Sequence, residues 1–282
     1  MVDSIKLRNE VKLPSVGLGT WQINDKDLMS EVISCAYDSG YTLFDTAASY
    51  SNEIALSKAI ARAGIPREKI LLSDKVWNTC RGYEQTIEAC KKSMKKLKTD
   101  YLDLYLVHWP ASVKLYTDWA QINADTWRGM ERLYKDGLVR AIGVCNFKTH
   151  HLEKLKETAE IMPFINQIEY HPGFTQYELV TYCRENYIQI EASSPLGNGR
   201  ILENDQIKEI ALSIGKSAAQ ICLRWGVQNG SIVIPKSSDK DRIMQNIDIF
   251  DFELTEGQMK ILSELPFCGG LNLDSDKITE FG

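Results

Sequence analysis

Residues 102–108 read Leu-Asp-Leu-Tyr-Leu-Val-His, a nearly unbroken apolar run that ends in a histidine. A run of this length and composition is typical of a strand buried on both faces, as in a parallel sheet. Similar short runs, rich in β-branched residues, recur before and after it. The full set is Val16–Gly19, Thr42–Asp45, Ile70–Lys75, Leu102–His108, Val139–Val144, Phe164–Glu169, Ile188–Ser193 and Ile232–Pro235. We therefore predict eight buried strands.

Longer amphipathic segments separate these runs and have the period of a helix. They include Leu28–Ser39, Glu84–Lys98, Thr126–Asp136 and Gln206–Ile214. Gly40, Gly64, Gly137 and Gly215 lie just past helix-like segments, where a C-cap favours positive φ. Strands that alternate with helices predict a parallel sheet, and eight such units predict a closed (β/α)8 TIM barrel.

An open, doubly wound sheet is the competing interpretation. It is disfavoured because no G-x-G-x-x-G follows the first strand. The N-terminal alternation of Ile5–Leu7 and Val11–Leu13 predicts a β-hairpin that closes the barrel bottom. Since no Pro/Gly/Ser-rich linker interrupts the chain, we expect one domain over residues 1–282.

Composition excludes several classes of protein. The net charge of −5 offers no basic face to nucleic acid or anionic lipid, and we expect neither partner. No apolar run approaches the length of a membrane helix. The seven cysteines include no C-x-x-C and the four histidines show no metal-ligand spacing, so we expect reduced thiols, no metal and a cytoplasmic protein. We also expect a monomer.

Polar residues follow all eight apolar runs, at the ends where a barrel collects its chemistry. One polar residue at a strand end is usually a solvated terminus, but eight in register suggest a constructed site. The strand ends carry Gly19-Thr20-Trp21, Asp45 with Tyr50 beyond it, Lys75, His108-Trp109, Cys145-Asn146, Asn166-Gln167, Ser193-Ser194 and Lys236-Ser237.

Eight segments in this order resemble the aldo-keto reductase family over nearly the whole chain. They are VGLGTWQ (16–22), FDTAASYSNE (44–53), KVWN (75–78), DYLDLYLVHWP (100–110), GLVRAIGVCNF (137–147), NQIEYHP (166–172), SPLGNG (194–199) and IPKSSDKDRIMQN (234–246). The resemblance implies a (β/α)8 oxidoreductase that reduces aldehydes or ketones to alcohols with a nicotinamide cofactor. We expect NADPH, with NADH as the less favoured alternative.

The resemblance implies a catalytic set of Asp45, Tyr50, Lys75 and His108, and elementary chemistry agrees with it. Carbonyl reduction needs a proton donor, and tyrosine is a weak acid at neutral pH. A nearby Lys75 ammonium would lower the pKa of Tyr50 toward neutrality, and Asp45 would keep that ammonium in place and protonated. His108 would hydrogen-bond the carbonyl oxygen and orient it.

Each of these residues also has an ordinary interpretation when taken alone. Tyr50 could pack in the core, His108 could be a structural hydrogen-bonding group, and Lys75 could be exposed. Lys75 or Lys236 could instead form a Schiff base, as in a barrel aldolase. The runner-up to a reductase is a redox-sensing or binding module, in which the barrel holds NADPH with little turnover.

By resemblance, Asn146 and Gln167 meet the nicotinamide amide, and the Ser194–Gly199 turn lies under the pyrophosphate with outward backbone N–H groups. Lys236, Ser237 and Arg242 resemble a 2′-phosphate clamp. The cofactor-binding set is Gly19, Thr20, Trp21, Asp45, Asn146, Gln167, Ser194, Leu196, Gly197, Lys236, Ser237, Arg242 and Asn246, the last of which should meet the adenine.

Four positions depart from the family pattern. Cys145 stands where a serine is usual, and Ser193 stands where an aromatic ring is usual. Asp239 lies within the expected phosphate clamp, and Gln245 replaces a common acid. We expect these changes to affect cofactor affinity and the preference for NADP over NAD.

Aromatic side chains predict the substrate site. The expected substrate-binding set is Trp21, Tyr50, Trp77, His108 and Trp109, which would form an aromatic mouth for a small carbonyl compound. Trp119, in the connection from Ala111 to Ala124, is a further candidate. The tail Cys268–Gly282 is expected to fold over the mouth, disorder being the alternative.

Overall fold

The computed structural model describes residues 2–278 and contains an eight-stranded, all-parallel sheet. The strands follow one another around the sheet in chain order. They are β3 (Leu18–Gly19), β4 (Leu43–Asp45), β5 (Leu71–Val76), β6 (Leu102–Val107), β7 (Val139–Cys145), β8 (Ile165–Glu169), β9 (Gln189–Ser193) and β10 (Ile232–Val233). Nearly every residue of β4 to β8 is buried, as the continuous apolar runs require.

The sheet closes on itself between its first and last strands. Val16 forms a parallel bridge with Val233, and the Gly17 N–H donates to the Val233 carbonyl at 2.9 Å. The Gly19 N–H continues the seam by donating to the carbonyl of Pro235 at 3.1 Å. The predicted closed barrel is therefore confirmed.

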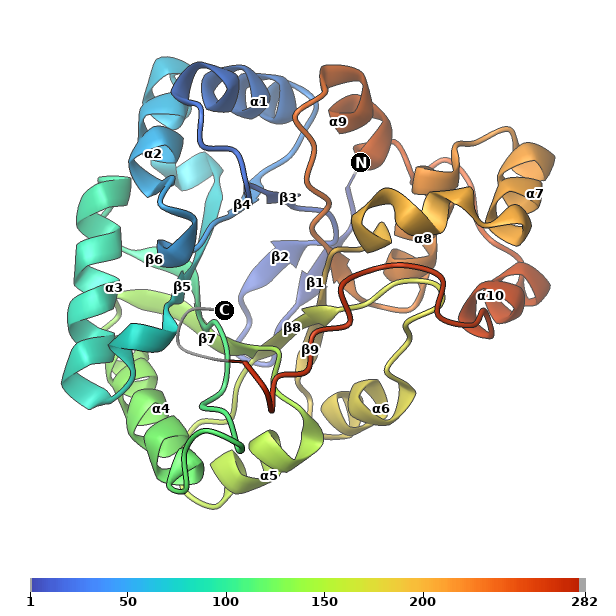
Figure 1. The fold of residues 1–282 in the computed structure, drawn as a ribbon. Coiled ribbons are helices and arrows are strands. Elements are labelled where there is room, and N and C mark those ends of the chain that lie inside the picture. The colour runs from blue at the N-terminus through green and yellow to red at the C-terminus, as the bar shows by residue number, and fades with distance from the viewer. Residues whose placement is uncertain (1, 279–282) are drawn as a thin grey trace.

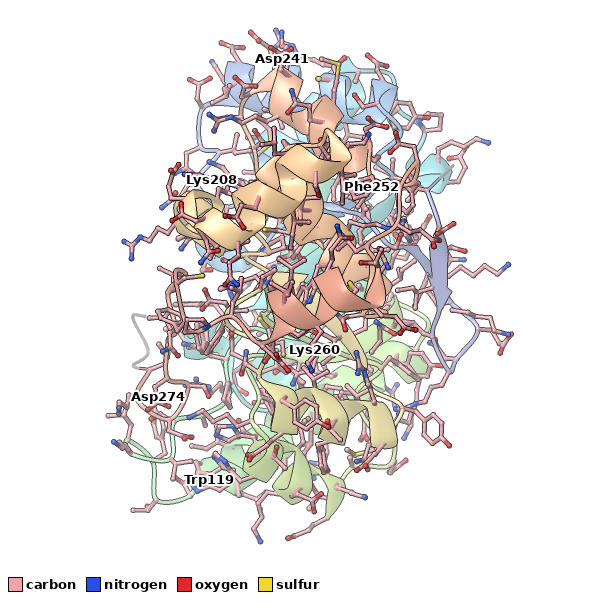
Figure 2. All side chains as sticks on the ribbon, turned by 90° about the vertical axis from the view of Figure 1, so that its right-hand side faces the viewer. Trp119, Lys208, Asp241, Phe252, Lys260 and Asp274 are labelled. Carbon is pink, nitrogen blue, oxygen red and sulfur yellow. The ribbon has the colours of Figure 1, made fainter. Side chains whose placement is uncertain are left out.

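Helices surround the barrel (Figure 1). Those that follow the strands are α1 (Lys26–Asp38), α2 (Glu53–Arg62), α3 (Tyr83–Leu97), α4 (Trp119–Lys135), α5 (Thr149–Lys156), α6 (Tyr177–Glu185), α8 (Ala218–Gln228) and α9 (Lys240–Ile247). Two more, α7 (Asp205–Ile214) and α10 (Glu256–Ser263), pack against each other beside this ring; Lys208 and Lys260 mark them in Figure 2. The four glycines predicted at helix ends all have positive φ.

The start of one helix and the end of one strand differ from the prediction. Helix α4 begins at Trp119 and not near Thr126, because the polar Asn123 is buried in its first turns and accepts the Ala111 N–H at 2.7 Å. Apolar periodicity could not register that contact. Strand β10 ends at Val233, before Pro235, which has no amide hydrogen for the ladder.

An N-terminal hairpin covers one end of the barrel. Strands β1 (Ser4–Lys6) and β2 (Lys12–Pro14) pair antiparallel, and Leu13 is fully buried. At the turn, Asn9 Nδ2 donates to the Arg140 carbonyl at 3.0 Å, and the Arg8 guanidinium donates to the Met162 carbonyl. Because these carbonyls lie at the starts of β7 and β8, the hairpin closes the barrel bottom, as predicted (Figure 1).

The segment after α10 crosses the opposite end of the barrel, where the strands finish (Figure 1). In Figure 2 Asp274, on this segment, lies on the side of the molecule away from the hairpin. The tail therefore folds over the mouth as far as residue 278, and residues 279–282 of the expected tail lie outside the described residues. Among the described helices, none is long and apolar enough to cross a membrane.

Candidate active site

A buried ion pair lies at the ends of β4 and β5. Lys75 Nζ is 2.6 Å from Asp45 Oδ2, and the two side chains are 0% and 3% exposed. Lys75 also donates to the Thr46 carbonyl at 2.9 Å, while Asp45 Oδ1 accepts from Ser73 Oγ at 2.9 Å. Burial opposes the charge, but Asp45 outweighs it and raises the pKa of Lys75. The lysine is therefore a fixed cation.

Tyr50 ends the short 3-10 turn Ala48–Tyr50 after β4, and its ring centroid is 5.1 Å from Lys75 Nζ. Burial raises the pKa of Tyr50 to about 12, although Lys75 lowers it through its charge and a side-chain hydrogen bond. The predicted effect of Lys75 is confirmed, but the prediction that the pKa falls toward neutrality is wrong, because burial is the larger effect. Tyr50 keeps its proton at neutral pH.

His108 follows β6 and is only 8% exposed. Its ring packs edge-on against Tyr50, with centroids 5.7 Å apart, and against Trp77 at 5.1 Å. Burial, with the Lys75 charge, lowers the pKa of His108 well below its ordinary value. The imidazole is therefore neutral and has one N–H to donate, while Ser49 Oγ lies 3.4 Å from its Nδ1.

A cavity of about 480 Å³ opens beside these groups. All five predicted substrate residues line it: Trp21, Tyr50, Trp77, His108 and Trp109. The tail supplies Leu271, Leu273 and Ile278 as an apolar cover. Trp119 does not line this cavity; it packs edge-on against His150 and His151, at centroid distances of 5.9 Å and 5.4 Å.

A second cleft, of about 920 Å³, adjoins the cavity and shares Trp21, Tyr50, Gln167, Ser193 and Ser194 with it. The predicted cofactor residues in its wall are Gly19, Trp21, Asp45, Gln167, Ser194, Leu196, Lys236, Ser237, Arg242 and Asn246. Lys236 and Arg242 are exposed and form no ion pair within residues 2–278. They are available to an anion.

Three predicted cofactor residues lie outside the wall of this cleft. Asn146 lines the neighbouring cavity, with φ of 62°, and its Nδ2 donates to the His108 carbonyl at 3.0 Å. Thr20 is buried and donates its hydroxyl to the Asp45 carbonyl at 2.9 Å. A Cβ on Gly197 would lie 2.5 Å from Ile201 Cγ2 and 3.3 Å from the backbone nitrogen of Gly270, so this glycine lets its own turn and the tail pack closely.

The turn over which the pyrophosphate was expected differs from the prediction. Ser194 begins it in the left-handed region with φ of 45°. The Gly197 N–H donates to the Ser194 carbonyl and the Gly199 N–H to the Leu196 carbonyl, both at 2.8 Å. The prediction that these two amides point outward is therefore wrong, because turns of this kind form i to i+3 hydrogen bonds.

The four residues that depart from the family pattern all lie at the cleft or the cavity, and the structure gives their positions or contacts. Cys145 Sγ contacts Gln167 Oε1 at 3.5 Å and Asn146 Nδ2 at 3.1 Å, so the thiol lies between the two amides. Asp239 lines the cleft, but its Oδ1 caps α9 by accepting the Arg242 N–H at 2.9 Å. This carboxylate occupies the N-terminus of α9, where an anion could otherwise bind. Ser193 and Gln245 also line the cleft.

Sequence reasoning missed the groups that hold the tail down. Glu169 at the end of β8 accepts the N–H groups of Leu271 and Asn272, each at 2.7 Å. Lys148, after β7, lies 2.5 Å from Asp274 and 2.8 Å from Asp276. These partners are distant in the sequence, so no local motif could have revealed them.

His150, His151 and Asp276 offer donor atoms within 4.8 Å of one another, a grouping that a metal ion could use. However, His151 Nδ1 accepts the Lys148 N–H at 3.1 Å, which leaves the proton on Nε2 in the neutral ring. Burial lowers the pKa of His151 to about 3, and the Lys148 ammonium lies 2.8 Å from the same Asp276. We interpret the group as an anchor for the tail.

Comparison with known proteins agrees with this geometry. The model of the Aldo/keto reductase family matches residues 15–266. The chain therefore belongs to the aldo/keto reductase family and is an oxidoreductase.

Individual relatives make the similarity more specific. The chain is 46% identical over 263 residues to glyoxal reductase of Bacillus subtilis (strain 168), covering 93% of this chain and 92% of that protein. It is 38% identical over 276 residues to methylglyoxal reductase DkgA of Escherichia coli (strain K12), covering 97% of each. Among solved structures, a mutant of Gox0644 in complex with NADPH has a TM-score of 0.91 and 34% identity, covering 99% of each chain.

Proposed function

We propose that this protein is a single-domain, NADPH-dependent reductase that converts aldehydes or ketones to alcohols. One observation carries the proposal: Tyr50 lies in the wall shared by the cleft and the cavity, with the Lys75–Asp45 ion pair beside it. A proton donor at that junction can act on a carbonyl in the cavity while a cofactor occupies the cleft. NADPH, when bound, supplies the hydride.

The cleft has groups that suit NADPH. Lys236 and Arg242 are exposed cations without ion-pair partners among residues 2–278, and they would hold the 2′-phosphate. Asn246 is 4% exposed and lines the same cleft, where it would meet the adenine. The side-chain amides of Asn146 and Gln167 would bind the carboxamide of the nicotinamide.

Side chains of the protein donate the proton that the reduction needs. The Tyr50 hydroxyl donates it to the substrate oxygen as that oxygen becomes an alkoxide, which is much more basic than a phenolate. Lys75 then stabilises the phenolate left behind, and Asp45 keeps Lys75 protonated. The neutral His108 donates its N–H to the same oxygen and orients the carbonyl.

The cavity indicates the substrate class. Its tryptophans and the tail leucines favour aldehydes with flat or apolar bodies. The names of the relatives, glyoxal reductase and methylglyoxal reductase, add small α-oxoaldehydes to the candidates.

A Schiff-base mechanism at Lys75 is disfavoured because imine formation needs a neutral amine. Asp45 raises the pKa of Lys75 and binds its ammonium at 2.6 Å. Borohydride added with a carbonyl substrate should therefore trap no adduct on Lys75, and mass spectrometry would detect one.

The test of the proposed function is Tyr50→Phe, which removes the hydroxyl and keeps the ring. Turnover, followed by NADPH absorbance with glyoxal, methylglyoxal and an aromatic aldehyde, should fall by about two to four powers of ten. NADPH affinity should stay close to that of the wild type. Tyr177→Phe, at a residue 77% exposed, is the matched control and should leave turnover unchanged. Normal turnover in Tyr50→Phe would overturn the assignment of Tyr50.

A further inference from the structure

Glu191 is a buried carboxyl group to which the proposed chemistry gives no role. It lies on β9, in register with Gln167 of β8, and is 0% exposed. Its Oε2 accepts from Gln167 Nε2 at 2.8 Å, while its Oε1 has no hydrogen-bond partner among residues 2–278. Burying a carboxyl group with an unsatisfied oxygen is costly, so its presence in the barrel interior needs an explanation.

The side-chain amide of Gln167 lies between two carboxylates. Its Nε2 donates to Glu191 Oε2 and also to Asp45 Oδ1, the latter at 3.2 Å. Because a carboxylate can only accept, both N–H groups of Gln167 are committed to the interior. Its Oε1 must therefore face the other way, where Cys145 Sγ lies at 3.5 Å.

The orientation has a consequence at the junction of cleft and cavity, both of which Gln167 lines. An outward carbonyl oxygen accepts hydrogen bonds but cannot donate them. The Cys145 thiol is only a weak donor, so it can be displaced by a stronger one. A ligand that brings an N–H group to this point is favoured over one that brings a carbonyl or a methyl group.

We propose that Glu191 is a positioning residue: it fixes the orientation of the Gln167 side chain and so determines which group of the cofactor Gln167 binds. With Asp45, it fixes the Gln167 amide so that Oε1 accepts from the carboxamide NH2 of the nicotinamide. The inference rests on the proposed function, since it takes the cleft to be the NADPH site. It assigns a ligand-discriminating task to a residue that has no direct place in the cleft wall.

The charges around Glu191 support this arrangement. Asp45 on β4, Lys75 on β5 and Cys145 on β7 are the titratable groups that act on it across the barrel interior, and Lys75 is the one cation among them. Burial and the Asp45 charge raise the pKa of Glu191 to about 7. A protonated Glu191 could donate to Gln167 as well as accept, which would loosen the fixed orientation.

The experiment compares two ligands on four proteins. The ligands are NADP+ and the analogue in which a methyl ketone replaces the carboxamide, so that only the NH2 is lost. The proteins are the wild type, Glu191→Gln, Gln167→Leu and the double variant. Quenching of tryptophan fluorescence gives each dissociation constant, because Trp21 is 41% exposed beside the cleft.

The wild type should prefer NADP+ by about three- to tenfold, the weight of one neutral hydrogen bond. Glu191→Gln keeps the shape but can present either a donor or an acceptor, so the preference should fall below about twofold. Gln167→Leu should abolish it, and adding Glu191→Gln to that background should change nothing further.

An unchanged preference in Glu191→Gln, or a further loss in the double variant, would overturn the inference. If Glu191→Gln does not fold, the wild type alone decides the question: its preference should shrink as pH falls from about 8.5 to about 5.5, across the pKa of Glu191. A preference constant over that range would also overturn it. Failure of the wild type to bind either ligand would instead overturn the proposed function.

Discussion

Lys75→Met should destabilise the fold as well as end the chemistry, and the structure gives the size of the effect. The substitution leaves Asp45 as a carboxylate that is 3% exposed and has lost a partner at 2.6 Å. Breaking a buried ion pair on one side costs about 3–5 kcal/mol. For a chain of this size each kcal/mol lowers Tm by roughly 2–4 °C, so a fall of roughly 6–20 °C is expected.

The double variant Lys75→Met with Asp45→Asn separates charge from packing. Neutralising the orphaned carboxylate removes its desolvation penalty, and the Ser73 hydroxyl and Gln167 amide can still hydrogen-bond the new side-chain oxygen. The double variant should therefore recover most of the lost stability. It should stay inactive, because the proposed mechanism needs a cation at this position to stabilise the phenolate of Tyr50.

Urea denaturation at about pH 7, monitored by tryptophan fluorescence and circular dichroism, gives the free energy of unfolding of both variants. Lys92→Met is the matched control, since Lys92 forms its ion pair with Glu88 on an exposed helix face, where such pairs are weak. The reasoning is refuted if Lys75→Met loses less than about 1 kcal/mol, or if the double variant loses as much as the two single variants combined.

Three further outcomes are expected. Arg242→Ala should weaken NADPH binding about tenfold or more and NADH binding little, because in the proposed complex the exposed guanidinium binds the 2′-phosphate; equal losses for both, measured by fluorescence titration, would place Arg242 elsewhere. Ser193→Tyr should tighten NADPH by up to about tenfold through stacking in the same assay, and unchanged binding would mean that another side chain covers the nicotinamide. Burial raises the pKa of Asp74 from 3.8 to about 8, so the folded state binds more protons than the unfolded state between these values, and the free energy of unfolding falls as pH rises through that window. Asp74→Asn should flatten this decline in urea titrations, and a slope like that of the wild type would exclude Asp74 as its source.

Most of the barrel could be predicted from the sequence because strands buried on both faces leave a plain apolar signature. The run at Leu102–Val107 appears in the structure with almost the predicted bounds. The candidate site could be predicted from the sequence equally well, because the ends of parallel strands in a barrel all lie at one rim. Asp45, Lys75 and His108 meet there for that topological reason.

The remainder depends on three-dimensional surroundings. The net pKa of Tyr50 is set by burial, which no spacing reveals. The contact of Glu169 with Leu271 joins segments far apart in the chain, and the partner of Gln167 on β9 required the register of the sheet. Asp239 is different, because an aspartate just before a helix is a recognisable N-cap signal that could have been read from the sequence.

The seam that closes the barrel has a consequence for biosynthesis. Val16 is synthesised long before its bridge partner Val233, because seven other strands lie between them in the sequence. One edge of β3 therefore stays unpaired until the segment of β10 has been synthesised, and until then this open edge can pair with other chains. The N-terminal hairpin also cannot form its hydrogen bonds to the barrel at first, since the carbonyls of Arg140 and Met162 are synthesised much later. A nascent chain released before residue 233 should consequently aggregate, whereas a chain in which Val16 has paired with Val233 no longer exposes this edge.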